Sequence, residues 1–523
     1  MRHLRAVLWA ALFLAFTGAS ASADDVTLRS RDGAIELSGT LLGFDGEFYR
    51  VETRYGELTV DGSGVLCEGP GCPSLTDYVA ELSISGSSTI GEVLMPALVE
   101  GFALQNGLTA ERLKDDETHF TYVLSQPATG TDPATVVGRF RFRVSSTDEG
   151  FADLLADEAD LVMALREIRP GELALAREVG LGELDDVNRS RVLALDAMTV
   201  IVSPTNPVSA LSVSDLARVL SGEIANWRTL GGPDAPISVH LRDAQSGIAQ
   251  AVEDRVLRPA RLALMESVTR HADNASLSRA VARDQLAIGV ASFSEIGNSK
   301  ALALSGPCGF QLRANRLTIK TEDYPLTAPM FLYIPARRLP KLAREFLTYT
   351  RTGPAQIITR RAGFVDQAPE EIALNAQGDR VANAVAVAEG DPGLDALKRM
   401  VETLSPRRRL STSFRFEPGA ARLDAQSRSN VQHLAGAMEA GIYDGRDMVF
   451  VGFSDGVGPA EGNQRIALQR AQAVKQAVEA AVEASSLSQV RLSTDAFGEA
   501  MPMACDDTRW GRQVNRRVEV WVR

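Results

Sequence analysis

From Leu82 to about Ala368 the chain repeats one pattern, in which short β-branched runs alternate with helix-like segments. This alternation is typical of α/β proteins, in which helices connect the parallel strands of a sheet. A length of 523 residues corresponds to roughly three or four domains of ~150 residues. We therefore expect a large α/β unit with other folded units on either side of it.

The first residues have the layout of a cleavable secretory signal. Arg2 and Arg5 precede an apolar run over 6–16, and Ala21-Ser22-Ala23 follows. We expect residues 1–23 to be this signal, without a lipid anchor, because no cysteine follows the apolar run at a lipobox position. No later stretch approaches the ~20 apolar residues of a membrane-spanning helix. The sequence thus predicts an exported, soluble chain.

Residues 24–78 show short alternating runs separated by glycine-marked turns, which predict a small antiparallel β module. Its role is open between a spacer or packing platform and a separate wall or protein contact. Cys67 and Cys72 enclose a turn-prone spacer, which predicts a small-loop disulfide. Cys308 and Cys505 lie in different candidate domains, and the sequence leaves open whether they are free or bridged. Only five His are scattered along the chain, so we expect no metal and no cofactor.

The formal charge of −12 argues against nucleic acid as a partner, since no basic stripe with interleaved aromatic residues occurs. Arg407-Arg408-Arg409 is the only short basic run. We interpret it as a solvated entrance to the last domain, with a docking site for an anionic wall polymer or lipid as the alternative.

Three strand-to-helix turns in the α/β region carry small hydroxyl residues. They are Ser85 to Thr89, Ser145 to Gly150, and Arg242 followed by Ser246-Gly247. Such a helix start directs backbone N–H groups, hydroxyls and the positive end of the helix dipole towards one point, although the same residues also make ordinary N-caps. Two helix starts and one guanidinium that converge on one cleft would bind an oxyanion.

With these turns, residues 79–368 resemble phosphate-binding proteins of the PstS type, the substrate-binding components of ABC importers. Further matching segments are Ala159-Asp160-Leu161, Val219 to Trp227, Leu230-Gly231-Gly232 and Asp323 to Leu326. The resemblance implies a type II periplasmic-binding-protein fold, with two α/β lobes that close over the ligand at a hinge, and an ABC permease as a partner. It implies an anion site at Ser88, Thr89, Ser145, Ser146, Arg242, Ser246 and Gly247.

Two places depart from that family's pattern. Ile248 stands where the family commonly has Thr. Where that family can place an Asp that accepts the proton of hydrogen phosphate, this chain has Arg166 and Glu167. Loss of the acceptor would remove selection against sulfate unless Glu167 replaces it. For Arg166 the alternative is a surface salt bridge between the lobes. The ligand is open between phosphate, another oxyanion, and a phosphorylated or carboxylated wall fragment.

Near the end of the chain, Asp455 follows a strand-like run and Arg470 lies fifteen residues later in a helix-like segment. Side by side, a carboxylate and a guanidinium suit a zwitterion such as a free amino-acid end of a wall peptide; the alternative is a surface salt bridge of little energetic value. Residues 407–523 resemble the OmpA-like peptidoglycan-binding domain. The matching segments are Val451 to Asp455, Asn463, Ile466 to Ala471, Gly511-Arg512 and Asn515 to Glu519.

The resemblance implies that Asp455 and Arg470 hold the diaminopimelate residue of the peptide stem, with Asn463 and Arg517 supporting the loop and the pocket. Phe453 replaces the family's usual His and Ala467 its usual Ser. Residues 369–406, which show helical periodicity from Leu394 to Leu404, are expected to be a linker with a short helix.

We therefore expect a binding protein of the periplasm, for phosphate or a related oxyanion, anchored to peptidoglycan and associated with the wall or the outer membrane. The alternative is a scaffold with a degenerate ligand site between the wall and an outer-membrane protein. An enzyme is disfavoured, because His240 and Ser246 are the best base and nucleophile and no Gly-x-Ser-x-Gly elbow surrounds them.

Overall fold

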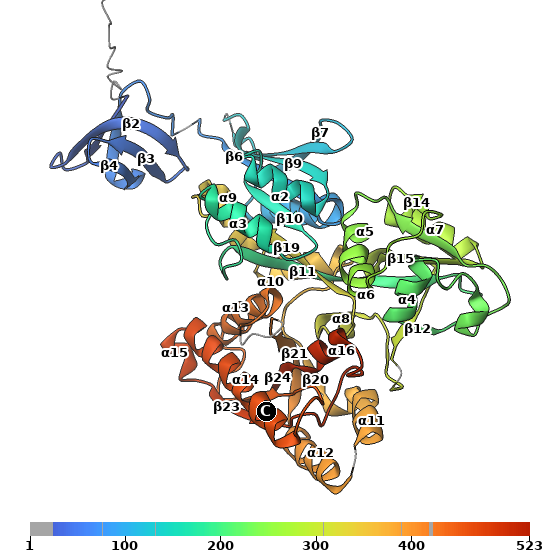
Figure 1. Cartoon of the computed structure of the whole chain (residues 1–523). Coiled ribbons are helices and arrows are strands. Elements are labelled where there is room, and N and C mark those ends of the chain that lie inside the picture. The colour runs from blue at the N-terminus through green and yellow to red at the C-terminus, as the bar shows by residue number, and fades with distance from the viewer. Residues whose placement is uncertain (1–24, 76, 131, 307, 389, 418–421) are drawn as a thin grey trace, which may run out of the picture. The chain divides into compact units, whose positions relative to one another are not determined.

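The computed structural model describes residues 25–523 except 76, 131, 307, 389 and 418–421. The chain divides into two compact units, Met1–Ala80 and Glu81–Arg523, which Figure 1 colours along the chain. The predicted signal, residues 1–23, lies outside the described residues. Within the described ranges, no helix combines the length and the apolar character that crossing a bilayer requires.

The first unit is a five-stranded antiparallel sheet with the order β4-β3-β2-β1-β5. Its strands are β1 (Val26–Ser30), β2 (Glu36–Phe44), β3 (Phe48–Thr53), β4 (Gly56–Asp61) and β5 (Val65–Glu68). A small core of Val26, Leu28, Tyr49 and Val51 stabilises it. The Sγ atoms of Cys67 and Cys72 are 1.98 Å apart, so a disulfide closes the short loop between them.

The second unit opens with a large mixed sheet, in the order β14-β13-β15-β11-β19-β10-β6-β9-β8-β7, with β16 paired to β11. The strands are β6 (Ala80–Ser87), β7 (Thr109–Lys114), β8 (His119–Gln126), β9 (Thr135–Ser145), β10 (Leu161–Ala164), β11 (Ser190–Val202), β13 (Ser238–Arg242), β14 (Thr269–His271), β15 (Ala287–Ser292), β16 (Lys300–Ala301) and β19 (Thr327–Tyr333). Strands β6 and β10 pair in parallel, and so do β13, β14 and β15. Parallel pairing between neighbours is what the α/β alternation predicts.

Helices and short connections surround this sheet. They are η2 (Ile90–Leu94), α1 (Met95–Gln105), α2 (Thr147–Leu155), α3 (Pro170–Glu178), α4 (Val213–Leu220), α5 (Gly247–Val252), η4 (Glu253–Leu257), α6 (Arg258–Ala260), α7 (Asn274–Arg283), α8 (Arg316–Lys320), α9 (Lys341–Tyr349) and α10 (Gly353–Arg361). A small second sheet contains β12 (Ala210–Ser212), β17 (Ala303–Ser305) and β18 (Gln311–Leu312).

Strand β11 connects two lobes. Its residues 190–197 pair with β19, and its residues 198–202 pair with β15. The first lobe is the part that contains β6 to β10, β19 and helices α1–α3, α9 and α10. The part around β13 to β15 and helices α4–α8 is the second lobe.

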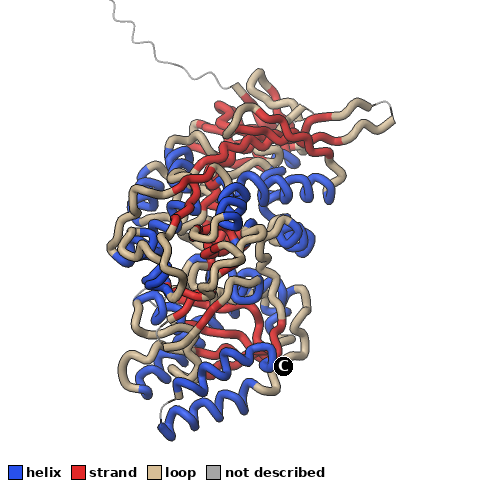
Figure 2. Tube along the Cα trace, turned by 90° about the vertical axis from the view of Figure 1, so that its right-hand side faces the viewer, coloured by secondary structure: helices blue, strands red, loops and turns tan. Residues whose placement is uncertain are grey.

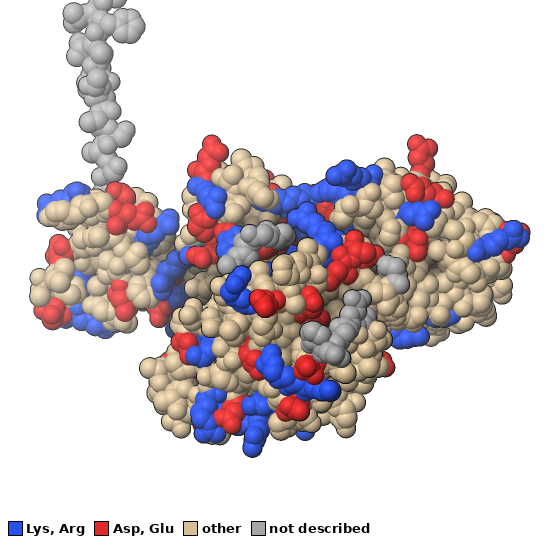
Figure 3. Space-filling model, turned by 60° about the horizontal axis from the view of Figure 1, so that its bottom comes forward, with Lys and Arg blue, Asp and Glu red and all other residues tan. Residues whose placement is uncertain are grey.

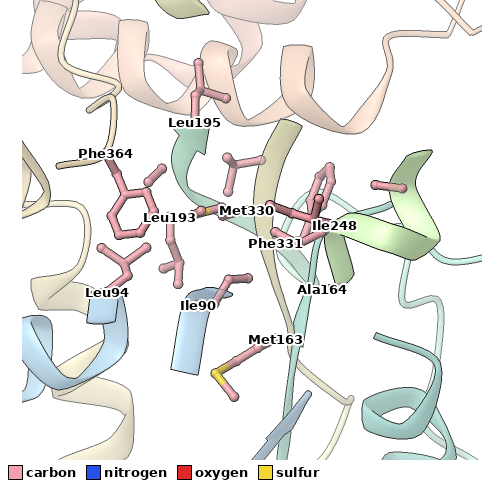
Figure 4. Packing of buried hydrophobic residues seen from close by; sticks show 14 of the residues in the cluster. Ile90, Leu94, Met163, Ala164, Leu193, Leu195, Ile248, Met330, Phe331 and Phe364 are labelled. Atoms are coloured by element: carbon pink, nitrogen blue, oxygen red, sulfur yellow. The ribbon is translucent and has the colours of Figure 1, made fainter. Parts of the chain in front are cut away.

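One continuous apolar core runs through both lobes. Figure 4 shows Ile248, from α5 of the second lobe, near Ala164 and Phe331 of the first. Ile248 is only 4 % exposed, which is the environment that an aliphatic side chain favours. The position at which the sequence predicts a lost hydroxyl therefore contributes to apolar packing between the lobes.

The C-terminal domain is a five-stranded sheet in the order β20-β21-β24-β22-β23. Its elements are β20 (Glu371–Ala373), α11 (Gly378–Val387), α12 (Gly390–Leu404), β21 (Arg408–Arg415), α13 (Ala425–Glu439), β22 (Asp447–Gly452), α14 (Ala460–Ala481), α15 (Ala484–Leu487), β23 (Arg491–Ala496), α16 (Arg509–Asn515) and β24 (Arg517–Val522). Figure 2 shows helices packed against these strands.

Residues 369–406 differ from the linker that the sequence predicts. They contain β20, which pairs with β21, and the two helices α11 and α12. Leu397, Met400 and Leu404 share a buried cluster with Val449 and Trp521 of the sheet. The periodic apolar positions therefore cover a face of the sheet, and the segment is part of the folded domain.

The C-terminal domain contacts both lobes. A disulfide joins Cys308 of the second lobe to Cys505, which decides the pairing that the sequence leaves open. Gln426 Nε2 donates a hydrogen bond to Gln367 Oε1 of the first lobe at 3.2 Å. Arg422 forms an ion pair with Asp185 of the first lobe at 3.0 Å. The domain is thus fixed to both lobes by covalent and polar contacts.

Arg409 corrects the interpretation of the basic run as solvated. Its side chain is only 1 % exposed, and its Nη1 lies 2.8 Å from Oδ2 of Asp323 in the second lobe. On the face drawn in Figure 3, Lys and Arg side chains are interspersed with Asp and Glu. Among the described residues on that face there is no continuous basic stripe of the kind that nucleic-acid binding needs.

Candidate functional sites

The three predicted hydroxyl-bearing turns all lie at helix starts. Thr89 immediately precedes η2, Ser146 caps α2 and Ser246 caps α5. The Oγ atom of Ser146 accepts from Glu149 N, and that of Ser246 from Ala249 N, both at 3.2 Å. Each capping oxygen is used as an acceptor, so its O–H group remains able to donate to a ligand.

The turns of the two lobes meet at Gly247. A Cβ atom at Gly247 would lie 3.0 Å from Oγ of Ser87 and 2.8 Å from Cδ1 of Leu165. The backbone N–H of Leu165 donates to Oγ1 of Thr147, the first residue of α2, at 3.1 Å. The starts of α2 and α5 and the end of β6 therefore converge on one place, as the sequence predicts for an oxyanion site.

Two buried donors at this place have no hydrogen-bond partner among the described residues. They are Oγ of Ser87 and Nε of Arg242, on residues that are 0 % and 5 % exposed. Arg242 also donates from Nη2 to the carbonyl of Ala272 at 2.7 Å. Unpartnered buried donors cost ~1–3 kcal/mol each, and a bound anion would remove that cost.

Charged neighbours define the electrostatics around Arg242. Burial raises the pKa of Glu92, while the positive charge of Arg242 opposes this rise. Hydrogen bonding by Ser276 lowers the pKa of Asp273, and Arg242 lowers it further. Both carboxyl groups are therefore within the electrostatic influence of the guanidinium.

Of the remaining predicted anion residues, Ser88 is buried and Ser145 is half-buried. Ser88 lies between Ser87 and Thr89 at the end of β6, and Ser145 is the last residue of β9. All seven predicted residues thus lie at the three turns. Ser87 is the member that the sequence argument omitted, although it belongs to the same hydroxyl run.

Arg166 and Glu167 do not face this site. Arg166 Nη2 lies 2.6 Å from Oε1 of Glu172 and also contacts Asp148, all within the first lobe. Burial raises the pKa of Glu167 to about 7, and the charge of Asp424 in the C-terminal domain adds to that rise. The replacement of the missing proton acceptor by Glu167 stays a prediction. The salt bridge between the lobes is made by Arg169 and Asp254 at 3.0 Å.

A second candidate site lies at the exit of β22. Asp455 Oδ2 is 2.7 Å from Nη1 of Arg516. Burial lowers the pKa of Arg470, Arg516 lowers it further, and Asp455 opposes the shift. The Asp455 carboxylate thus interacts with two guanidinium groups, whereas the sequence argument paired it with Arg470 alone. Arg516 belongs to the matching segment Asn515 to Glu519. Its position next to Arg517 was the sequence signal that could have identified it as a site residue.

Asn463 and Arg517, the other two predicted residues of this site, contact other side chains of the domain. Asn463 Nδ2 donates to Oε2 of Glu499 at 2.9 Å. Arg517 is fully buried, and its guanidinium stacks 4.2 Å from the ring centre of Phe453. Phe453, which replaces the family's usual His, therefore supports the loop by a cation–π contact with Arg517. Among the described residues, no group of three His, Cys, Asp or Glu side chains could hold a metal ion.

Comparison with known proteins bears on both sites. A family model described as the PBP superfamily domain matches residues 73–352, just over half of the chain, and the OmpA family model matches residues 415–516. Protein SphX of Synechococcus elongatus is 26 % identical over 234 residues, which cover 42 % of this chain and 67 % of SphX. Outer membrane porin F of Pseudomonas fluorescens is 33 % identical over 114 residues, which cover 22 % of this chain and 33 % of the porin.

Among solved structures, an ABC-type phosphate transport receptor from Vibrio cholerae matches 54 % of this chain and 99 % of its own length. The sequence identity is 20 % and the TM-score is 0.40.

Proposed function

Because the chain belongs to the PBP superfamily through residues 73–352 and carries an OmpA family domain over residues 415–516, we propose that it is a wall-attached periplasmic binding protein for phosphate or a related oxyanion. The observation that carries the proposal is the pair of buried, unpartnered donors on Ser87 and Arg242 where the starts of α2 and α5 meet. The proposed anion-binding set is Ser87, Ser88, Thr89, Ser145, Ser146, Arg242, Ser246 and Gly247.

The periplasm is the proposed compartment. The two disulfides, Cys67–Cys72 and Cys308–Cys505, suit an oxidising environment. The relative from Bacillus subtilis, named as the phosphate-binding protein PstS, supports an anion as the ligand. An ABC permease would have to lie beside the wall-attached protein, since attachment removes free diffusion between receptor and permease.

Replacement of Arg242 by Met is expected to weaken anion binding about a hundredfold. Removing one partner of a buried, hydrogen-bonded charge pair costs ~2–5 kcal/mol. Isothermal titration of the full chain with phosphate and, separately, sulfate measures the loss. Arg218→Met is the matched control, because Arg218 is an exposed residue of α4 that pairs with Glu223. Equal affinities for the Arg242 and Arg218 variants would place the anion elsewhere.

For the wall, we propose that Asp455 accepts hydrogen bonds from the ammonium of a diaminopimelate stem peptide while Arg470 and Arg516 bind its carboxylate. This division follows from the carboxylate lying between two cations. Asn463 and Arg517 support the loop through Glu499 and Phe453.

Both Asp455→Asn and Arg470→Met are expected to weaken binding to purified sacculi about tenfold or more, since each removes charge-assisted hydrogen bonds of ~1.5–3 kcal/mol. Co-sedimentation with sacculi measures the bound fraction. Asp447→Asn is the control, because Asp447 pairs with Arg491 on the same sheet, at the other end of β22. Sedimentation that is unchanged in both variants would contradict the anchoring role.

A second candidate function is an envelope scaffold between peptidoglycan and an outer-membrane protein. The favouring observation is apolar packing at the anion site, where Leu165 and Ile248 are both only 4 % exposed. In that case neither anion would give heat or thermal stabilisation, while sacculus binding would persist.

A further inference from the structure

Leu165 lies within the proposed anion site. It is the residue that follows β10, and its N–H group donates to Thr147 at the start of α2. Its Cδ1 atom lies next to Gly247 at the start of α5, and Oγ of Ser87 lies next to the same glycine. An apolar branch thus lies between the two helix starts, beside one of the unpartnered donors.

The nearby carboxylates have other partners or are exposed. Asp153 accepts hydrogen bonds from Arg143 at 2.6 Å and from Ser85. Asp148 forms ion pairs with Arg166 and Arg169. Asp273 accepts the backbone N–H of Ser276 as the cap of α7.

Two further carboxylates near Arg242, those of Glu92 and Asp243, are exposed to solvent. The inner part of the site therefore contains hydroxyl, guanidinium and backbone N–H groups together with Leu165, whose side chain offers a ligand oxygen no acceptor.

This composition has a consequence for hydrogen phosphate. The dianion carries one P–OH group, which must donate to an acceptor when it is buried, and a P–OH group that points at the side chain of Leu165 finds none there. An unsatisfied buried donor costs ~1–3 kcal/mol, and sites reject ligands whose polar groups they cannot pair. A carbon substituent in place of the hydroxyl has no proton to donate and gains contact with an apolar side chain.

Resting on the oxyanion function proposed above, we propose that the site selects phosphorus oxyanions with one apolar substituent, of the alkylphosphonate class, over inorganic phosphate. Leu165 is the specificity-determining residue. Three oxygens of the ligand accept from Ser87, Arg242 and the helix starts, and the carbon substituent packs against Leu165.

The test is a titration series on the full chain with methylphosphonate, phosphate and sulfate, at an alkaline pH where all three anions carry two negative charges. Methylphosphonate has the shape of phosphate with CH3 in place of OH, and sulfate has neither group. We expect methylphosphonate to bind about tenfold or more tightly than phosphate. Phosphate binding as tightly as methylphosphonate overturns the inference and leaves the oxyanion function standing. Failure of all three anions to bind overturns the proposed function itself.

Variants of Leu165 separate a specific contact from general packing. Leu165→Ser, which supplies an acceptor, is expected to lower the affinity ratio of methylphosphonate to phosphate about tenfold. Leu165→Met keeps an apolar side chain of similar volume and is expected to keep the ratio. Leu113→Ser, at an exposed position of the edge strand β7, controls for the substitution itself. A folded Leu165→Ser variant with an unchanged ratio overturns the role of Leu165. If thermal unfolding shows that this variant does not fold, the affinity ratios of methylphosphonate to phosphate for Leu165→Met and for the wild type decide whether the inference stands.

Discussion

Replacing Cys308 and Cys505 together by Ser is expected to lower the free energy of unfolding by about 5 kcal/mol. The bridge joins positions 197 residues apart, and constraining an unfolded loop of that length is worth about 5 kcal/mol by chain entropy. Denaturant titration of the oxidised wild type and the double variant measures the difference. The transition to follow is that of residues 81–523, because the bridge connects the second lobe to the C-terminal domain.

The short disulfide provides the matched control. Cys67 and Cys72 are only 5 residues apart, so the same relation predicts a loss of about 2 kcal/mol for their double Ser variant. That loss should appear in the unfolding of the first unit. A Cys308/Cys505 variant that loses no more stability than the short-loop variant would contradict the entropic argument.

The long bridge also bears on how the anion site works. Binding proteins of two lobes close over their ligand about a hinge, and here the C-terminal domain is attached to both lobes. It contacts the second lobe through Cys308 and Asp323 and the first through Asp185 and Gln367. Any change in the angle between the lobes must therefore strain or break contacts with the C-terminal domain.

The α/β alternation predicted the fold class, and short motifs such as Ser85 to Thr89 and Val451 to Asp455 carried the two family resemblances, which the family models confirm. These features are local, because strand periodicity, helix caps and short motifs lie within a few residues of each other. The same is true of the Cys67–Cys72 loop, which is closed as its spacing indicates.

The junction between the domains was not predictable in the same way. Arg409 reads as part of a basic surface run, yet its partner Asp323 lies 86 residues earlier in the chain. The apolar positions of α12 indicate a helix but do not say which face of which sheet they cover. Contacts between residues distant in sequence depend on the assembled topology, and local patterns carry no signal for them.

At the sites, the sequence indicated the turns but not the details of their contacts. It named Arg242 and the serines, because their types and spacing carry the chemistry, and it omitted Leu165, because an aliphatic residue after a buried strand is ordinarily core. It likewise paired Asp455 with Arg470 and did not include Arg516, whose side chain forms the ion pair with Asp455. Side-chain direction decides such cases, and a single sequence does not give it.

A buried cluster of charges stabilises this junction around Glu519, which is fully buried. Its Oε1 lies 2.7 Å from Nε of Arg517, its Oε2 lies 3.3 Å from Nε of Arg409, and Arg380 also contacts it. Burial alone would raise the pKa of Glu519, but the three guanidinium groups outweigh it and hold the pKa well below its usual range. The carboxylate therefore stays charged and compensates cations that are largely removed from water.

Glu519→Gln is expected to lower the free energy of unfolding by about 3–5 kcal/mol, because removing one partner of a buried ion pair leaves uncompensated charge. Gln keeps the shape of the side chain, so the loss reports the charge and not a cavity. Among the described residues of this cluster, Asp323 would then be the carboxylate left to balance Arg380, Arg409 and Arg517. Denaturant titration of both proteins at neutral pH measures the difference.

Glu371→Gln is the matched control, because Glu371 of β20 pairs with Arg446 and Arg408 near the surface and such pairs contribute ~0–1 kcal/mol. Losses of similar size in the two variants would mean that Glu519 is not essential to the balance of buried charge. A much larger loss for Glu519→Gln, accompanied by separate unfolding of the C-terminal domain and the lobes, is the expected result. It would establish that this carboxylate balances the three arginines beside the ion pair of Arg409 with Asp323, which connects the C-terminal domain to the second lobe.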